Sequence, residues 1–319
     1  MRQRAAAGGV RRFWRRVSPL SRRQFVLWAG MLALRRVQLS TALAPLLGGA
    51  EGTPMRPHTV HTDSFASDAL RRTLPYTLLL PADFDPAMPH GVLYLLHGMG
   101  GTHTHWATLS DLTRHAAAYP LVIVCPDAEN SCYANGANGE RWEDAIAADL
   151  PAHIEAQYGV RGDRGGRAIG GLSMGGFGAF NIGMRHPERY AAISTLSGAF
   201  MMGRINWGAD NPQLVQILGP VGSPTRREYD PETVLARAVA THGAGTLPVL
   251  AMDVGAADYP DLVASNRRLR DALMRLGVPH TYREEPGGHT WEYWNRETPF
   301  TLRFVAAAMG LLPNGETAA

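Results

Sequence analysis

Short, uninterrupted apolar runs alternate with helical patterns along most of this 319-residue chain, and this alternation constrains the fold more than any other feature. The apolar runs span Tyr76–Leu80, Gly91–Gly98, Leu121–Asp127, Arg167–Ser173, Tyr190–Gly198 and Leu247–Gly255, and a last strand is expected at His280–Glu285. Helical patterns cover Trp142–Tyr158, Gly175–His186, Pro231–Ala240, Leu262–Leu276 and Tyr293–Gly310. Continuous apolar strands of this length are typical of a parallel sheet covered on both faces. The sequence therefore predicts an α/β fold, a mostly parallel doubly wound sheet with helices on both faces.

The basic residues are distributed unevenly, which changes the meaning of the formal charge of +3. Ten arginines precede the first acidic residue, Glu51, whereas the rest of the chain has 21 basic and 28 acidic residues, a net charge of −7. Because an acidic body repels phosphate backbones, we expect no nucleic-acid binding. The chain contains no lysine, which excludes a Schiff base and a phosphate-loop lysine.

The arginine-rich start predicts two regions, an N-terminal extension over residues 1–52 and a folded domain over residues 53–319. Within the extension, the stretch SRRQFVLWAGMLAL (Ser21–Leu34) resembles a twin-arginine export signal, in which paired arginines precede an apolar segment. The segment is too short for a membrane anchor, which needs about 20 apolar residues, so no stable membrane span is expected. We therefore expect a periplasmic or secreted protein. The alternative is a cytoplasmic protein whose arginine-rich extension is disordered or precedes the true start codon.

The strongest motif is G-x-S-x-G at Gly171–Gly175, directly after a predicted strand and at the start of a predicted helix. A serine hydroxyl is a weak nucleophile unless a base takes its proton and the backbone presents it clear of its neighbours. A sharp strand-to-helix turn presents the serine, and it leaves room only for small residues two positions before and after it. The alternative is an ordinary tight turn, which the flanking strand and helix make improbable. Ser173 is the predicted nucleophile.

Hydrolases with this serine turn supply an acid and then a histidine later in the chain. Asp258 falls just past the strand that ends near residue 255, and His289 follows the last predicted strand in a glycine-rich loop. Asp253 is a rival acid, but it lies within its strand. Asp261 is expected to cap the next helix. The predicted catalytic residues are Ser173, Asp258 and His289.

A second glycine-rich turn follows the strand that contains YLLHGMGG. The backbone N–H groups of Met99, in this turn, and of Met174, after the nucleophile, are predicted to bind the oxyanion. Neighbouring Gly98 is a candidate for the substrate pocket. His97 is expected to hold the turn by hydrogen bonds.

With these residues identified, the chain resembles the esterase D-type branch of the α/β-hydrolases, which includes tributyrin, acetyl-xylan and feruloyl esterases, S-formylglutathione hydrolases and mycolyltransferases. The resemblance spans about residues 76–311 and rests on LYLLHGMGGTHTHW, PDAENSCYAN, GLSMGGFGAF, HPERYAAISTLSGAF and GGHTWEYW. It implies the α/β-hydrolase fold and hydrolysis of carboxylic esters by a serine nucleophile, with no cofactor and no metal.

Several aromatic residues fall on loops or helix starts at the expected carboxyl edge of the sheet, where they could stack on a sugar or wall an acyl pocket. They are Trp106, Tyr133, Trp142, Trp291 and Trp294, of which the first four are named as pocket candidates together with Gly98. The alternative is that most of them are packing residues. The expected substrate is a small-molecule or carbohydrate ester with a short acyl group.

Other activities and partners stay open at this point. Acyl transfer of the mycolyltransferase type and S-formylglutathione hydrolysis use the same three residues, and a catalytically silent binding module would keep only the fold. Cys125 and Cys132 lack the spacing of a zinc site, and both free thiols and a disulfide are possible. The sequence does not predict the oligomeric state.

Overall fold

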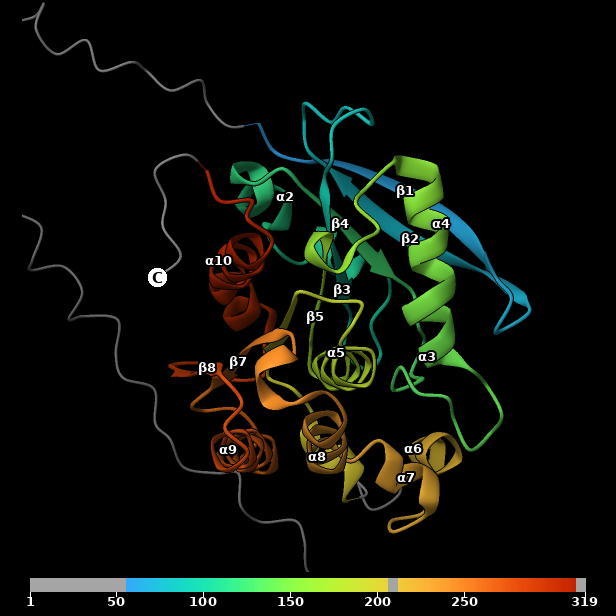
Figure 1. The fold of residues 1–319 in the computed structure, drawn as a ribbon, viewed down its shortest axis with the longest axis vertical. Helices are drawn as coiled ribbons and strands as arrows, with labels where there is room; N and C mark the ends of the chain where they lie inside the picture. The colour runs from blue at the N-terminus through green and yellow to red at the C-terminus, as the bar shows by residue number, and fades with distance from the viewer. Residues whose placement is uncertain (1–55, 206–211, 314–319) are drawn as a thin grey trace, which may run out of the picture. The chain divides into compact units, whose positions relative to one another are not determined.

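Eight strands form one sheet in the computed structural model, which describes residues 56–205 and 212–313 (Figure 1). The strands are β1 (Thr59–Ser67), β2 (Arg72–Leu80), β3 (Gly91–Leu96), β4 (Leu121–Pro126), β5 (Arg167–Leu172), β6 (Ala192–Leu196), β7 (Val249–Gly255) and β8 (His280–Glu285). Their order across the sheet is β1-β2-β4-β3-β5-β6-β7-β8. Every neighbouring pair from β4 to β8 is parallel, so the predicted mostly parallel sheet is confirmed.

Two features of the sheet differ from the sequence prediction. β2 runs antiparallel to both of its neighbours, although its apolar run resembles those of the parallel strands. It is covered on both faces like them, and burial rather than strand direction produces such a run. β1 was not predicted, because only Phe65 and Ser67 of its nine residues are buried. It is recognisable only by its continuous antiparallel pairing with β2.

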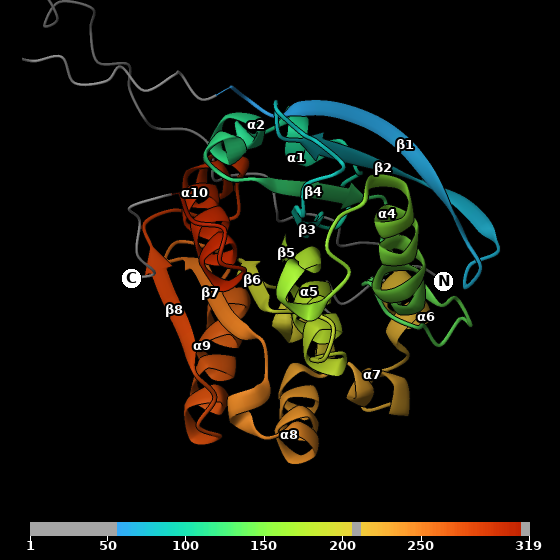
Figure 2. The same ribbon diagram turned by 45° about the horizontal axis from the view of Figure 1, so that its top comes forward.

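Helices cover both faces of the sheet (Figures 1 and 2). They are α1 (His105–Thr108), α2 (Leu112–His115), α3 (Trp142–Asp144), α4 (Leu150–Tyr158), α5 (Met174–Arg185), α6 (Pro212–Leu218), α7 (Pro224–Glu228), α8 (Pro231–His242), α9 (Pro260–Arg275) and α10 (Trp291–Ala308). Successive residues of β3 point to opposite faces and join different apolar clusters. Tyr94 belongs to the cluster that includes residues of α4, α5, α8 and α9, whereas Leu95 belongs to the cluster that includes residues of α1, α2 and α10. The predicted helices on both faces are therefore confirmed.

The predicted helix over Trp142–Tyr158 is interrupted. A wide π-type turn, Ala145–Asp149, separates α3 from α4. Pro151, at the start of α4, lacks the backbone N–H that a regular helix would direct to the fourth residue before it. A wider turn accommodates this missing hydrogen bond.

Some predictions concern residues outside the described ranges. The extension over residues 1–52, with its export-signal pattern, lies there entirely. Within the described ranges, no helix combines the length and apolar character that crossing a bilayer requires. Cys125 and Cys132 are both buried and free, and burial raises the pKa of the Cys132 thiol to about 12. The disulfide alternative is therefore not realised.

Candidate active site

Ser173 occupies a sharp turn between the end of β5 and the start of α5. Its φ and ψ angles are 54° and −116°, a backbone conformation that residues other than glycine rarely adopt. The Ser173 N–H donates to the Leu196 carbonyl over 2.9 Å, and the Ser173 carbonyl accepts from Ala199 N–H over 3.0 Å. The last residue of β6 and the chain just after it therefore hold the strained turn in place.

The glycines around Ser173 are required by close backbone contacts. A Cβ atom on Gly175 would lie 2.4 Å from the Leu96 carbonyl oxygen, and one on Gly171 would lie 2.7 Å from the Gly175 carbonyl oxygen. Both distances are well inside van der Waals contact, and backbone cannot move aside as a side chain can. The structure thus gives the physical reason for both glycines of G-x-S-x-G.

Three side chains that are distant in the sequence meet at this turn. Nε2 of His289 lies 3.0 Å from Oγ of Ser173. Nδ1 of His289 lies 3.0 Å from Oδ1 and 3.1 Å from Oδ2 of Asp258. Because a carboxylate can only accept, Nδ1–H donates to Asp258 and leaves the Nε2 lone pair facing the serine hydroxyl. The Asp258 side chain is fully buried, whereas 16% of the His289 side chain is exposed.

Backbone contacts between two loops align Asp258 with His289. After β7 and β8, Ala256 N–H donates to the Glu285 carbonyl and Ala257 N–H to the Gly287 carbonyl, both over 2.8 Å. Gly287 has φ of +143°, a value that glycine adopts without strain. The two loops therefore form one unit, which fixes the distance between carboxylate and imidazole.

The rival acid, Asp253, interacts with residues other than His289. It lies within β7, where the Tyr293 hydroxyl donates to it and Arg283 forms an ion pair of 3.1 Å. Burial raises the pKa of Asp253 to about 6, against the opposing effects of Tyr293 and Arg283. No contact joins it to His289 in the described part of the chain, so Asp258 is the carboxylate that pairs with His289.

The two predicted oxyanion donors come from turns that flank Ser173. Met174 is the first residue of α5, where backbone N–H groups lack acceptors within the helix. Met99 follows Gly98, and a Cβ atom on Gly98 would lie only 3.4 Å from Cβ of Ser173. Both backbone segments are thus adjacent to the nucleophile.

His97 holds the Met99 turn through both ring nitrogens. Nδ1–H donates to the Gly98 carbonyl over 2.8 Å, and Nε2 accepts from Ala128 N–H over 3.0 Å. Burial lowers the pKa of His97, which favours this neutral form. The expected structural role of His97 agrees with these contacts.

Three of the pocket candidates are packing residues, which corrects their assignment to the substrate pocket. Trp106, Tyr133 and Trp142 are each 1% exposed or less. Trp106 donates its indole N–H to the Leu96 carbonyl, and the Tyr133 hydroxyl donates to the His97 carbonyl. The Trp142 indole lies below the Arg72 guanidinium. None of the three presents a face to a ligand.

Two residues absent from the pocket candidates contact His289, and Trp291 lies next to one of them. The buried Trp294 ring meets the His289 ring edge to face, with centroids 4.9 Å apart, and its N–H donates to Ser197 Oγ over 3.2 Å. The Tyr259 ring lies 5.2 Å from His289. Trp291 is partly exposed and contacts Trp294 at 5.4 Å. Trp294 and Tyr259 stand close in sequence to His289 and Asp258, and that proximity was the available signal.

No group of three or more His, Cys, Asp or Glu side chains with the geometry of a metal site occurs within residues 56–205 and 212–313.

A wound parallel sheet with a nucleophile turn after β5, an acid after β7 and a histidine after β8 defines an α/β-hydrolase. The family described as "Putative esterase" matches residues 67–303. The chain belongs to this esterase family, and it is an esterase with the α/β-hydrolase fold.

Individual relatives support the same classification. An acetyl esterase of Caldicellulosiruptor saccharolyticus is 27% identical over 213 residues, which cover 64% of this chain and 79% of that protein. A ferulic acid esterase structure superposes with a TM-score of 0.67 at 31% identity, covering 80% of this chain and all of that one. The structure of the serine hydrolase FphF of Staphylococcus aureus superposes with a TM-score of 0.70 at 25% identity, and the match covers 78% of this chain and 98% of that one. The chain spans about half the length (52%) of a matching Mycobacterium tuberculosis esterase, which is 29% identical.

Proposed function

We propose that this esterase hydrolyses short-chain carboxylic esters through a covalent acyl-enzyme on Ser173. The observation that carries the proposal is the continuous hydrogen-bonded series from Asp258 through His289 to the Ser173 hydroxyl. A base within 3.0 Å of a hydroxyl can take its proton as the oxygen attacks.

In the first half of the reaction, His289 Nε2 takes the Ser173 proton while Oγ bonds to the ester carbonyl carbon. The carbonyl oxygen becomes an oxyanion and accepts from the N–H groups of Met99 and Met174, each worth about 3 kcal/mol in the transition state. Asp258 holds the imidazole in the required tautomer and stabilises its charged form. The tetrahedral intermediate collapses as His289 protonates the leaving alcohol.

In the second half, water replaces the alcohol. His289 takes one proton from the water, whose oxygen bonds to the acyl carbon, and then returns the proton to Ser173 Oγ. The carboxylic acid leaves and the resting enzyme is regenerated.

For the substrate, we propose an acyl group from acetyl to butyryl on an alcohol that is a carbohydrate. The acetyl esterase among the relatives supports a short acyl group, and the ferulic acid esterase supports ester hydrolysis in general. Hydrolysis rates on p-nitrophenyl acetate, butyrate and laurate test the acyl length. We expect acetate and butyrate to be hydrolysed faster than laurate, and a preference for laurate would overturn the proposal.

We also propose that the protein is exported by a twin-arginine route, on the pattern of Ser21–Leu34. N-terminal sequencing of protein from the native cell tests this. A mature terminus near Glu51 supports export, and an intact Met1 on cytoplasmic material contradicts it.

A further inference from the structure

The loop after β4, residues 127–133, has an unusual backbone and no role in the proposed mechanism. Glu129, Cys132 and Tyr133 have φ angles of 49°, 57° and 54°, which residues other than glycine rarely adopt. Six non-glycine residues in the described ranges have a positive φ, so half of them lie in this loop, and a fourth is Ser173. Backbone in this conformation concentrates at functional sites and persists where its surroundings hold it. The contacts of the loop consequently indicate what it supports.

The loop contacts the glycine-rich turn that follows β3. The Tyr133 hydroxyl donates to the His97 carbonyl over 2.9 Å, and Ala128 N–H donates to Nε2 of His97 over 3.0 Å. Both contacts hold the residue that precedes the turn. Asn130 reaches into the turn itself, because its Oδ1 atom accepts from Gly100 N–H over 2.6 Å. A substitution can remove this side-chain contact and leave the backbone of the loop in place.

Residues 98–101 form a hydrogen-bonded type II turn. Gly101 N–H donates to the Gly98 carbonyl over 2.9 Å. Met99, at the second position, lacks a positive φ, and Gly100, at the third, has φ of +72°, which is the combination that a type II turn requires. A type I turn differs by a flip of the central peptide, and glycine at the third position can adopt either form. The sequence of the turn therefore permits two orientations of the Met99–Gly100 peptide.

Asn130 selects one of these orientations. Gly100 N–H belongs to the central peptide, so a flip would turn it away and present the Met99 carbonyl to Oδ1 of Asn130 instead. Two acceptors would then face each other without a proton between them. The Asn130 amide is itself oriented, because its Nδ2 donates to Oε1 of Gln213, on α6, over 3.4 Å. The side chain thus presents its oxygen to the turn.

We propose that Asn130 is a positioning residue for the oxyanion site: by holding the Met99–Gly100 peptide, it keeps the Met99 N–H directed at the developing oxyanion. A flip of this peptide changes ψ of Met99, the residue whose own N–H is the predicted donor. Oxyanion donors act most strongly when they are fixed before the reaction, since no reorientation is then needed as charge develops. This inference rests on the proposed function and adds a residue that does not touch the substrate.

The test compares Asn130→Ala with the wild type in hydrolysis of p-nitrophenyl acetate and in inhibition by a trifluoromethyl ketone. Oγ of Ser173 adds to the ketone carbon while His289 takes the serine proton, and the adduct carries a tetrahedral oxyanion that mimics the transition state. We expect kcat to fall about tenfold, KM to stay within about twofold and the inhibition constant to rise about tenfold. Asn138→Ala is the matched control, because Asn138 is exposed and bonds to Glu140.

A second comparison locates the effect in the turn. Gly100→Ala disfavours φ of +72° and so drives the turn toward the flipped form, in which Asn130 has no N–H to accept from. Adding Asn130→Ala to Gly100→Ala should therefore lower kcat by less than about twofold further. Stoichiometric fluorophosphonate labelling of Ser173 counts the folded active sites of each variant, and rates are expressed per labelled site.

Three results would overturn this inference. An unchanged kcat and inhibition constant in Asn130→Ala would show that the turn needs no such support. A rise in KM with an unchanged inhibition constant would assign Asn130 to substrate binding, and a further tenfold loss in the double variant would place its effect outside the turn. Absence of Ser173 labelling in the wild type would instead show that the proposed function fails, so the two failures are distinguishable.

Discussion

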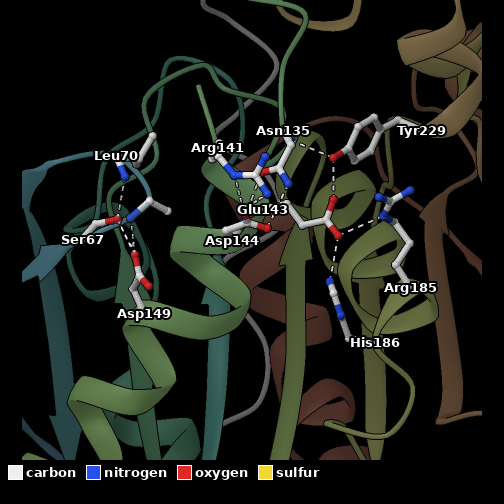
Figure 3. A network of polar contacts seen from close by, with 11 residues as sticks. Ser67, Leu70, Asn135, Arg141, Glu143, Asp144, Asp149, Arg185, His186 and Tyr229 are labelled. Atoms are coloured by element: carbon white, nitrogen blue, oxygen red, sulfur yellow. Dashed lines mark hydrogen bonds and ion pairs between the residues drawn. The ribbon is translucent and has the colours of Figure 1, made fainter. Parts of the chain in front are cut away.

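Two buried carboxylates near opposite ends of α5, Asp258 and Glu143, each pair with an imidazole. Of these two pairs, the one with Asp258 faces a serine hydroxyl and the one with Glu143 does not. Before the helix, Asp258 pairs with His289, whose other nitrogen lies 3.0 Å from Ser173 Oγ. At the other end of the helix, His186 directly follows the last residue of α5, and Nε2 of His186 donates to Glu143 over 2.8 Å (Figure 3). The pair alone therefore does not define a catalytic site.

The difference lies in what else the carboxylate and the imidazole contact. Glu143 also accepts from Arg185 Nε over 2.9 Å and from the Tyr229 hydroxyl, so its charge is neutralised by several donors (Figure 3). Burial raises the pKa of Glu143, but the hydrogen bonds from His186 and Tyr229 and the charge of Arg185 outweigh it and hold the pKa below its ordinary value. This network joins α3, the end of α5 and Tyr229, which follows α7, whereas the Asp258 pair directs its free imidazole nitrogen at a strained serine.

The largest predicted effect separates the two histidines. We expect His289→Ala to lower kcat by about 10⁶, because Ser173 loses its base. His186→Ala, the matched control, should keep kcat within about threefold. Steady-state rates on p-nitrophenyl acetate measure both, and a comparable loss in the two variants would break the distinction.

The two aspartates near the end of β7 give the next effect. Asp258→Asn should lower kcat by about 10⁴, because the amide no longer holds the required imidazole tautomer. Asp253→Asn removes a partner of Tyr293 and Arg283 and should leave kcat within about tenfold. The reverse order would transfer the acid role to Asp253.

Removal of the Glu143 carboxylate should lower the stability of the fold and leave the catalytic rate unchanged. Glu143→Ala removes one acceptor from the partly exposed Arg185 and His186 and from the buried Tyr229 hydroxyl, and it is expected to lower the free energy of unfolding by about 3 kcal/mol. Urea unfolding measures this loss. A variant with full stability would show that the network contributes nothing, and Asp144→Ala, on the same helix at a more exposed position, is the control.

The lowered pKa of Glu143 also predicts how stability depends on pH. A folded-state pKa below the ordinary value of 4.5 means that the unfolded chain binds the proton more tightly. The contribution of Glu143 is therefore present above about pH 4.5 and is lost as the pH falls toward the folded-state pKa. Glu143→Gln should show a shallower loss of stability over this acid range than the wild type, and identical curves would contradict the assignment.

The smallest predicted effect concerns the support of His289. Ser197→Ala removes the acceptor of the Trp294 indole N–H, a hydrogen bond worth about 1 kcal/mol. We expect kcat to fall about threefold to fivefold with KM unchanged, because the ring behind the imidazole is less firmly held. A change in KM alone would assign Ser197 to binding.

Local chemistry decided which parts of the fold and site could be predicted. Ser173 was predictable because the turn has room only for glycine on both sides of it, and these glycines form a visible sequence motif. Asp258 was predictable because it lies just past a strand end. The same reasoning could not separate Trp142, which is buried, from Trp291, which is partly open, since both follow loops and only packing distinguishes them. β1 was not predicted from the sequence because its mostly exposed side chains form no apolar pattern.

The most direct test of the central claim is the rate of covalent labelling by a fluorophosphonate, with the adduct located by mass spectrometry. The account predicts rapid, stoichiometric modification of Ser173 in the wild type and in His186→Ala, and a loss of at least 10³-fold in rate in His289→Ala. Modification at another residue, or an unchanged rate in His289→Ala, would contradict the claim that His289 activates the Ser173 hydroxyl.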